Sequence, residues 1–123
     1  MIKKIIKKDI LLKILWSTIE DFVGLWEINW ELRVLLPANN NTQNKVIAKK
    51  IIEHFLENGL VTLYYSKWGD QEIENIPLVE AKYLLNQNKY WSAPAIGETC
   101  IKIGITDKGS LFYIEDKIND LLS

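Results

Sequence analysis

Hydrophobic residues recur at helical spacing in the first half of this chain. Residues 9–16, in a repeat that reaches back toward Ile2, predict a short apolar helix. Ser17 and Glu20 then have the Ser-x-x-Glu form of a capping box, which predicts that a second helix opens here and covers about 18–36. One broad apolar face of that helix comprises Ile19, Phe22, Val23, Trp26, Trp30 and Val34. Only a narrow strip of glutamates interrupts the apolar surface, so we expect this helix to lie at the centre of the core.

A third helix is predicted over about 43–58, beginning at Asn41 or Thr42 after a turn rich in asparagine. Gly59 follows, and glycine is the residue best suited to a left-handed helix C-terminus. Residues 60–66 are rich in β-branched and aromatic side chains and predict a strand directly after the helix.

The second half of the chain predicts a return strand after a long excursion. Pro77 precedes a short helical pattern over 78–85, and a loop with two aromatic residues follows over 86–94. Residues 100–105 alternate in the manner of a strand, with three isoleucines on one face. Thr106 is expected to cap a last helix. The apolar repeat of that helix comprises Leu111, Ile114, Ile118, Leu121 and Leu122.

Two junctions, the helix–glycine–strand passage over 53–65 and the strand–threonine–helix passage over 101–112, resemble the core of a winged-helix domain. In such a domain a helix, a hairpin wing and a closing helix follow in that order. The expected fold class is therefore α+β and winged-helix-like, as a single domain over residues 1–123. Its core would be mostly helical. Its two- or three-stranded antiparallel wing, expanded over about 67–99, would carry an inserted short helix.

Length and composition fit one soluble globular domain. At 123 residues the chain is long enough for a real hydrophobic core. Cys100 is the single cysteine, so no disulfide within the chain is possible and a reducing compartment is expected. Lysines and Asp9 interrupt the apolar residues near the N-terminus, and no later run is long enough to span a bilayer. We therefore expect a cytoplasmic protein with no membrane association.

No pattern in the chain predicts catalysis, a metal site or a cofactor. With one histidine, His54, and one cysteine, metal ligands are too few. We expect Cys100 to be a small buried hydrophobe and His54 to flank a helix. Glu27 and Glu31 are one helical turn apart and could imitate a pair of catalytic carboxylates, but this spacing is more typical of a solvated stripe. No enzyme is expected.

Nucleic-acid binding is the first function that a winged helix invites. The helix before the wing offers Lys45, Lys49 and Lys50, together with two glutamates. The wing carries three lysines (Lys67, Lys82, Lys89) against five carboxylates (Asp70, Glu72, Glu74, Glu80, Glu98), a net charge of −2. A negative wing repels phosphate, so nucleic acid is an unfavoured partner that stays open as the alternative.

Acidic residues near aromatic ones instead favour a protein interface. Aromatic anchors ringed by charge are typical of binding surfaces, and an acidic surface attracts a basic partner. The competing interpretation is that Trp68, Tyr90 and Trp91 pack the inserted helix onto the core. The candidate partner-binding residues are Glu27, Glu31, Trp68, Asp70, Glu72, Glu74 and Trp91.

Three segments carry a further resemblance: residues 21–33, 76–81 and 90–94. In this order, around the helix–glycine–strand junction, they resemble small bacterial winged-helix-like proteins over roughly residues 18–115. Some proteins of this size and plan are immunity proteins of polymorphic or contact-dependent toxin systems. The resemblance implies a stoichiometric inhibitor of a cognate toxin domain, basic and often a nuclease. The alternative is a winged-helix transcription regulator that uses Lys45, Lys49 and Lys50.

Overall fold

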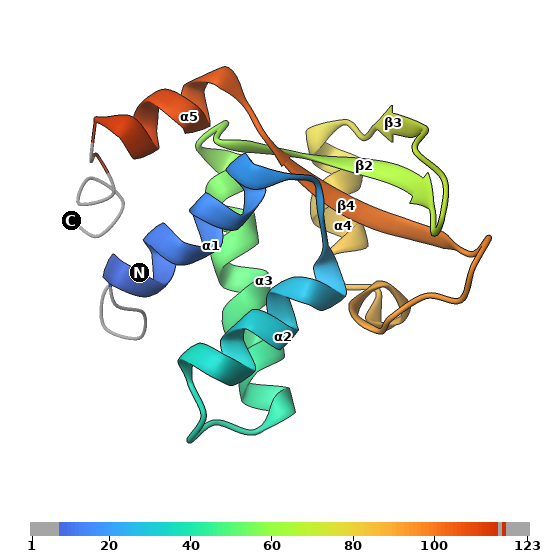
Figure 1. Ribbon diagram of the computed structural model, residues 1–123, viewed down its shortest axis with the longest axis horizontal. Helices are drawn as coiled ribbons and strands as arrows, with labels where there is room; N and C mark the ends of the chain where they lie inside the picture. Colours follow the sequence, from blue (N-terminus) through green and yellow to red (C-terminus); the bar gives the residue numbers. More distant parts are fainter. Residues whose placement is uncertain (1–7, 116, 118–123) are drawn as a thin grey trace.

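The computed structural model describes residues 8–115 and 117, which form an α+β fold (Figure 1). The helices of this part are α1 (Lys8–Glu20), α2 (Leu25–Leu35), α3 (Asn41–Glu57), α4 (Leu78–Leu84), the 3₁₀ turn η1 (Asn88–Trp91) and α5 (Asp107–Ile114). The strands are β1 (Val23–Gly24), β2 (Val61–Lys67), β3 (Ile73–Asn75) and β4 (Thr99–Ile105).

The four strands form one antiparallel sheet in the order β1-β4-β2-β3. The pairing of β2 with β4 is the longest, from Val61 opposite Ile105 to Lys67 opposite Thr99. The two-residue strand β1 adds to the other side of β4, and β3 adds to the other side of β2. The α+β class and the antiparallel strands agree with the sequence prediction, and the sheet has one strand more than the largest wing expected.

Alternation along β4 divides the sheet into two faces, as the sequence predicts. Ile101 and Ile103 are fully buried and lie opposite Tyr65 and Leu63 of β2. These side chains join one hydrophobic cluster with the buried residues of the helices. The intervening residues, among them Lys102, belong to the second face of the sheet.

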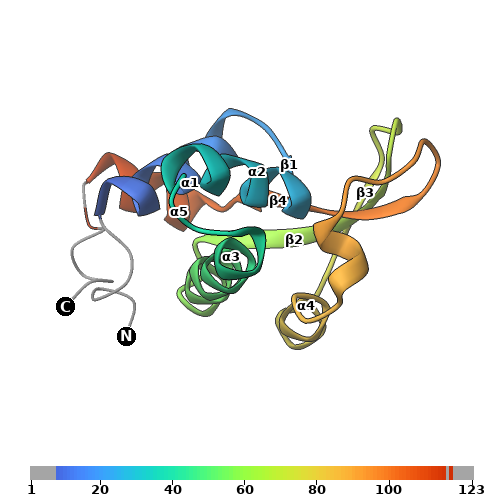
Figure 2. The ribbon, with the colours of Figure 1, turned by 90° about the horizontal axis from the view of Figure 1, so that it is seen from below.

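The helices lie on different sides of the central strands. Figure 2 shows α3 and α4 next to each other below β2, with α1 and α2 above it. Helices α1 and α5 lie side by side, and the rings of Trp16 and Tyr113 are 5.5 Å apart. The paired strands β2, β3 and β4 extend beyond helices α1, α2 and α3 toward the right of Figure 1.

The prediction of one helix over 18–36 is wrong, because α1 continues to Glu20 and β1 separates it from α2. The predicted capping box does not form. Instead, the Ser17 hydroxyl donates to the Lys13 carbonyl at 3.0 Å, and the Thr18 hydroxyl donates to the Leu15 carbonyl at 2.7 Å. Both hydroxyls thus bond back into the preceding turn of a continuing helix.

The expected buried face of the second helix is also wrong in part. Trp30 and Val34 are 46% and 79% exposed. The residues of α2 that are buried are Leu25, Trp26, Ile28, Asn29 and Leu32. A helix that is apolar on several sides does not determine from its own sequence which side is buried, and the packing of its neighbours decides this.

The later helix boundaries follow the sequence signals closely. Asn40 caps α3, since its side chain accepts a hydrogen bond from the Gln43 N–H at 2.8 Å. Gly59, with φ of 70°, ends the helix as expected. Thr106 caps α5 by accepting from the Gly109 N–H at 2.9 Å. The predicted extension of the first helix toward Ile2, and Ile118, Leu121 and Leu122 of the last repeat, lie outside the described residues.

The insertion between β2 and β4 contains β3, α4 and η1, of which only α4 was predicted. Trp91 holds it in place: the side chain is 3% exposed, and its Nε1 donates to the Leu85 carbonyl at 2.8 Å. The prediction that Trp91 contacts a partner is therefore wrong. The competing interpretation, in which it packs the insertion onto the core, is correct for this residue.

A second contact fastens α4 to the sheet. The Tyr65 hydroxyl on β2 donates a hydrogen bond to the Glu80 carboxylate on α4. This hydrogen bond, with burial and the negative charge of Glu80, raises the pKa of Tyr65 from 10.0 to about 12.

Trp91→Ala should lower the free energy of unfolding by about 3–5 kcal/mol, because it empties a buried aromatic site. Trp91→Phe should cost about 1–3 kcal/mol, since the Leu85 carbonyl loses its buried donor. Urea denaturation measures both. Trp68→Ala is the comparison, and its effect should be clearly smaller because that ring is 38% exposed. Equal losses for Trp68→Ala and Trp91→Ala would contradict the buried position of Trp91.

Glu80→Gln should return the pKa of Tyr65 toward 10, as measured by the absorbance of tyrosinate during alkaline titration. Tyr65→Phe identifies the phase that belongs to this residue. Because the fold raises this pKa, it favours the protonated phenol. The resulting stability is present below pH 10 and is lost as the pH rises toward 12. A titration of the parent in which every tyrosine ionises near pH 10 would contradict the hydrogen bond between Tyr65 and Glu80.

Candidate protein-interaction surface

Trp68 lines a cleft on the second face of the sheet and packs against a second tryptophan, Trp26. Trp26 is buried, and the ring of Trp68 meets it edge to face at 5.5 Å and 90°. Gly24 makes this packing possible, because a Cβ at that position would lie 2.3 Å from the Trp26 ring. The orientation of the half-exposed Trp68 is thus set by a buried ring that rests on the backbone of β1.

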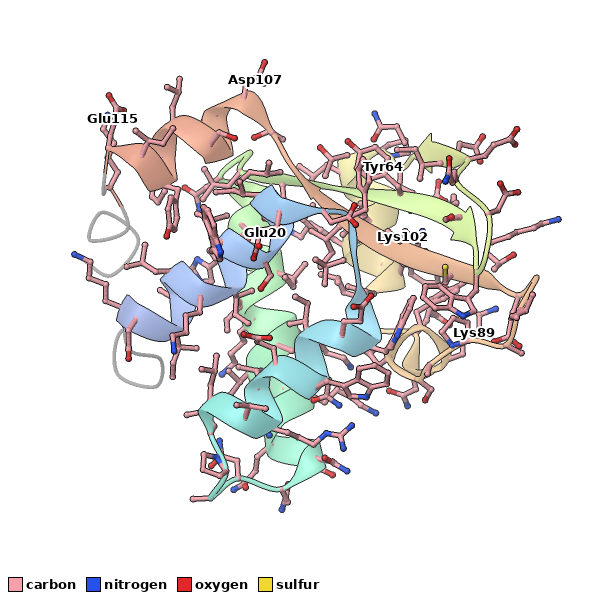
Figure 3. The ribbon with its side chains drawn as sticks, viewed as in Figure 1. Glu20, Tyr64, Lys89, Lys102, Asp107 and Glu115 are labelled. Carbon is pink, nitrogen blue, oxygen red and sulfur yellow. The ribbon has the colours of Figure 1, made fainter. Side chains whose placement is uncertain are left out.

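Phe22 also lines this cleft and packs against Tyr64. Their rings meet edge to face at 5.2 Å, and Phe22 is 42% exposed. Gly104 lies beneath them, where a Cβ would be 2.6 Å from Phe22 and 3.1 Å from Tyr64. Figure 3 shows Tyr64 and Lys102 on neighbouring strands beside the segment that joins α1 to α2.

The cleft has a volume of about 530 Å³, and we call it the aromatic cleft. It is lined by Asp21, Phe22, Glu27, Trp68, Asp70, Gln71, Ile73 and Lys102. Three of its side chains are carboxylates and one is a lysine, so the lining has a net charge of −2. The Lys102 ammonium lies over the Trp68 ring, 5.9 Å from its centroid. The cleft therefore combines aromatic surface with negative charge.

The three carboxylates of the aromatic cleft are held by backbone hydrogen bonds. Asp21 accepts from the Phe22 N–H at 2.7 Å, and Asp70 accepts from the Glu72 N–H at 3.2 Å. Glu27 accepts from the Gly24 N–H at 3.1 Å, at the start of α2. Each bond uses one carboxylate oxygen, so the acidic groups are positioned before any partner arrives.

A second depression, which we call the acidic groove, lies between the end of α1 and α2 and has a volume of about 340 Å³. Its lining comprises Ser17, Glu20, Val23, Glu27, Ile28, Trp30, Glu31 and Val34. Glu27 belongs to both the acidic groove and the aromatic cleft, so the two depressions meet at this residue. The exposed Trp30 and Val34 give the groove an apolar border.

Of the predicted partner-binding residues, the structure gathers four on these two depressions: Glu27, Glu31, Trp68 and Asp70. Glu72 and Glu74 are exposed and line a neighbouring depression of about 480 Å³, which Asp70 borders as well. Trp91 lies in the core and belongs to none of these surfaces.

Sequence reasoning missed Asp21, Phe22 and Lys102 as parts of the site. Phe22 was expected inside the core as part of a helix, and it lies instead in the short segment before β1. The pairing of Gly24 with Lys102 is what brings that segment over β4. No local pattern marks this pairing, although the extended pair Val23–Gly24 after a polar Glu20–Asp21 is a weak signal for a helix break.

The alternative nucleic-acid residues are on α3. Lys50 is exposed, whereas Lys45 and Lys49 are partly buried. Helix α4 lies beside α3 (Figure 2), and the Lys82 ammonium pairs with the Glu57 carboxylate at 3.3 Å. The C-terminal half of α3 therefore has a helix and an ion pair next to it rather than an open basic face.

His54 and Cys100 lie where the sequence predicts, on the flank of a helix and in a buried position respectively. His54 is partly buried on α3, and Cys100 is a buried free cysteine. Burial raises the pKa of the Cys100 thiol, which disfavours the reactive thiolate. In the described part of the chain, no three His, Cys, Asp or Glu side chains gather as metal ligands would. None of the described helices is long and apolar enough to cross a membrane.

Comparison with known proteins returns no match, whether with protein-family models, curated proteins or solved structures.

Gly24→Ala should disturb the packing of Trp26 beside the aromatic cleft, because the added methyl group would overlap the buried Trp26 ring. We expect a loss of near-ultraviolet circular dichroism from the Trp26–Trp68 pair and a stability loss of about 1–3 kcal/mol. Trp68→Leu identifies the part of the spectrum that belongs to the pair. An unchanged tryptophan spectrum in Gly24→Ala would show that the ring does not rest on β1.

Proposed function

We propose that this chain is a stoichiometric protein-binding inhibitor of the immunity type, which neutralises a basic toxin domain. A nuclease is the expected kind of toxin, since its nucleic-acid site is basic. The observation that carries the proposal is the junction of the acidic groove with the aromatic cleft at Glu27. This continuous surface offers carboxylates and exposed aromatic side chains together.

The chemistry of this surface suits a basic protein partner. Tryptophan is enriched among residues that dominate binding energy, and Trp30 and Trp68 are both exposed here. The carboxylates steer a positively charged partner toward the surface, which speeds association at low salt. Glu72 and Glu74 on the adjoining β3 side extend the negative charge beyond the cleft. A protein that occupies a toxin's basic site in this way blocks the substrate without any catalytic step.

We further propose that the fold is of the winged-helix type with an expanded wing. Its support is the order of α3, the β2–β4 hairpin and α5, with the insertion between the two long strands. The proposed site of action is the cytoplasm, for which the free Cys100 is the supporting observation.

The second candidate function is DNA binding, which the lysines Lys45, Lys49 and Lys50 on α3 favour. Against it stand α4 beside α3 and the acidic wing. The proposed inhibitor does not depend on these lysines, so the two functions can be separated by variants.

Coexpression with the C-terminal domain of the protein encoded beside this chain tests the inhibitor. The parent should restore growth and form a one-to-one complex by size-exclusion chromatography. Glu20→Lys with Glu31→Lys should slow association by about tenfold or more at low salt, with a smaller effect at high salt. Glu53→Lys on α3 is the control and should bind as the parent does. No complex with that domain, or equal losses for both variants, would contradict the proposal.

A gel shift with the DNA upstream of the chain's own gene tests the second function. Specific retardation at moderate salt that is lost in Lys49→Glu would favour the regulator and contradict the inhibitor. We expect no specific retardation, and equal behaviour of Lys49→Glu and the parent.

A further inference from the structure

The lining of the aromatic cleft suits a flat cationic group. Trp68 and Phe22 both line the cleft and are partly exposed, and each packs against a second ring, Trp26 or Tyr64. Aromatic faces attract cations, and tryptophan does so best. The Lys102 ammonium already lies over Trp68, which shows that a cation can approach this ring within the cleft.

The carboxylates of the cleft have unused capacity. Each of Asp21, Glu27 and Asp70 accepts one backbone hydrogen bond. Among the described residues none of the three forms an ion pair, and neither does Lys102. Although Lys102 lines the same cleft, Asp21, Glu27 and Asp70 therefore have no ion-pair partner among the described residues. A cation supplied by a partner would interact with both the Trp68 ring and these carboxylates.

We propose that the aromatic cleft binds an arginine side chain of the partner protein. A guanidinium is planar, so it can stack on Trp68 while its N–H groups donate to the carboxylates beside the ring. A lysine ammonium has compact charge and cannot stack in this way, and an apolar side chain would desolvate the carboxylates without replacing their hydrogen bonds. Arginine is also enriched in the centre of protein interfaces. This inference rests on the proposed function, because it names the group of the basic partner that the site recognises.

Lys102 competes with the incoming arginine for the Trp68 ring. It is attached by a flexible stem and makes no ion pair in the described residues, so it can turn toward solvent when the arginine enters. Its removal should therefore strengthen arginine binding. A surface that attracts cations only by its total charge would also bind more tightly without Lys102, but it would not distinguish arginine from lysine.

The probe is the blocked tripeptide acetyl-Gly-Arg-Gly-amide, titrated into isotope-labelled protein while the tryptophan indole signals are followed by NMR. The signal of Trp68 is assigned with Trp68→Leu. We expect saturable shifts at Trp68, with at least fivefold weaker binding of the lysine peptide and no saturation with the neutral citrulline peptide. Lys102→Gln should bind the arginine peptide several-fold more tightly, and Asp70→Asn several-fold more weakly. Glu53→Gln, on α3 and outside both depressions, is the matched control and should bind as the parent does.

Equal affinities for the arginine and lysine peptides would overturn the proposal, and so would the absence of shifts at Trp68. An equal loss in Glu53→Gln and Asp70→Asn would do the same, because it would indicate general attraction of the peptide to negative charge rather than binding at the cleft. Unfolding curves for each variant keep misfolding from imitating a loss of binding.

The cognate complex separates this inference from the proposed function. If the toxin domain binds and Trp68→Leu and Asp70→Asn leave its affinity unchanged, the inhibitor stands and the arginine site is wrong. If the tripeptide binds as expected but the neighbouring protein forms no complex, the arginine site stands and the proposed toxin partner is wrong.

Discussion

The pairing of β2 with β4 is the interaction on which the rest of the structure depends. It joins residues on either side of the insertion, and its register runs from Val61 opposite Ile105 to Lys67 opposite Thr99. Because successive side chains on a strand alternate, this one ladder supplies both the core and the outer surface. Ile103 enters the hydrophobic cluster on one face, while Lys102 enters the aromatic cleft on the other. A slip of one residue would exchange these two roles.

The short strand β1 converts the outer face of this ladder into a site. Its two residues pair with β4 and end the run of helix that an apolar sequence would otherwise continue. As a result Phe22 lies over Gly104, Trp26 packs under Gly24, and Glu27 points its carboxylate back to the start of α2. The cleft is therefore assembled from three separate segments of the chain. Both of its ring pairs depend on glycines, whose missing side chains let aromatic rings approach the backbone.

Two tryptophans of the insertion, Trp68 and Trp91, have different positions in the structure that the sequence does not distinguish. Trp68 and Trp91 are both in the predicted wing, and both are candidate interface residues by sequence. Trp91 donates to the Leu85 carbonyl inside the core, whereas Trp68 remains 38% exposed beside the carboxylates. The difference depends on how the insertion folds back onto α2 and α3, and the spacing of aromatic residues contains no information about that packing.

Sequence alone determined the features that depend on neighbours a few residues away. Asn40, Gly59 and Thr106 end or begin their elements as their local chemistry requires, and the isoleucines of β4 face the core. Tertiary structure decided what local chemistry leaves open. The break at β1 forms because a distant strand offers backbone hydrogen bonds there, and the buried side of α2 is the one that its neighbours cover. The acidic residues were visible in the sequence, but their meeting with Phe22 and Lys102 in one cleft required the folded sheet.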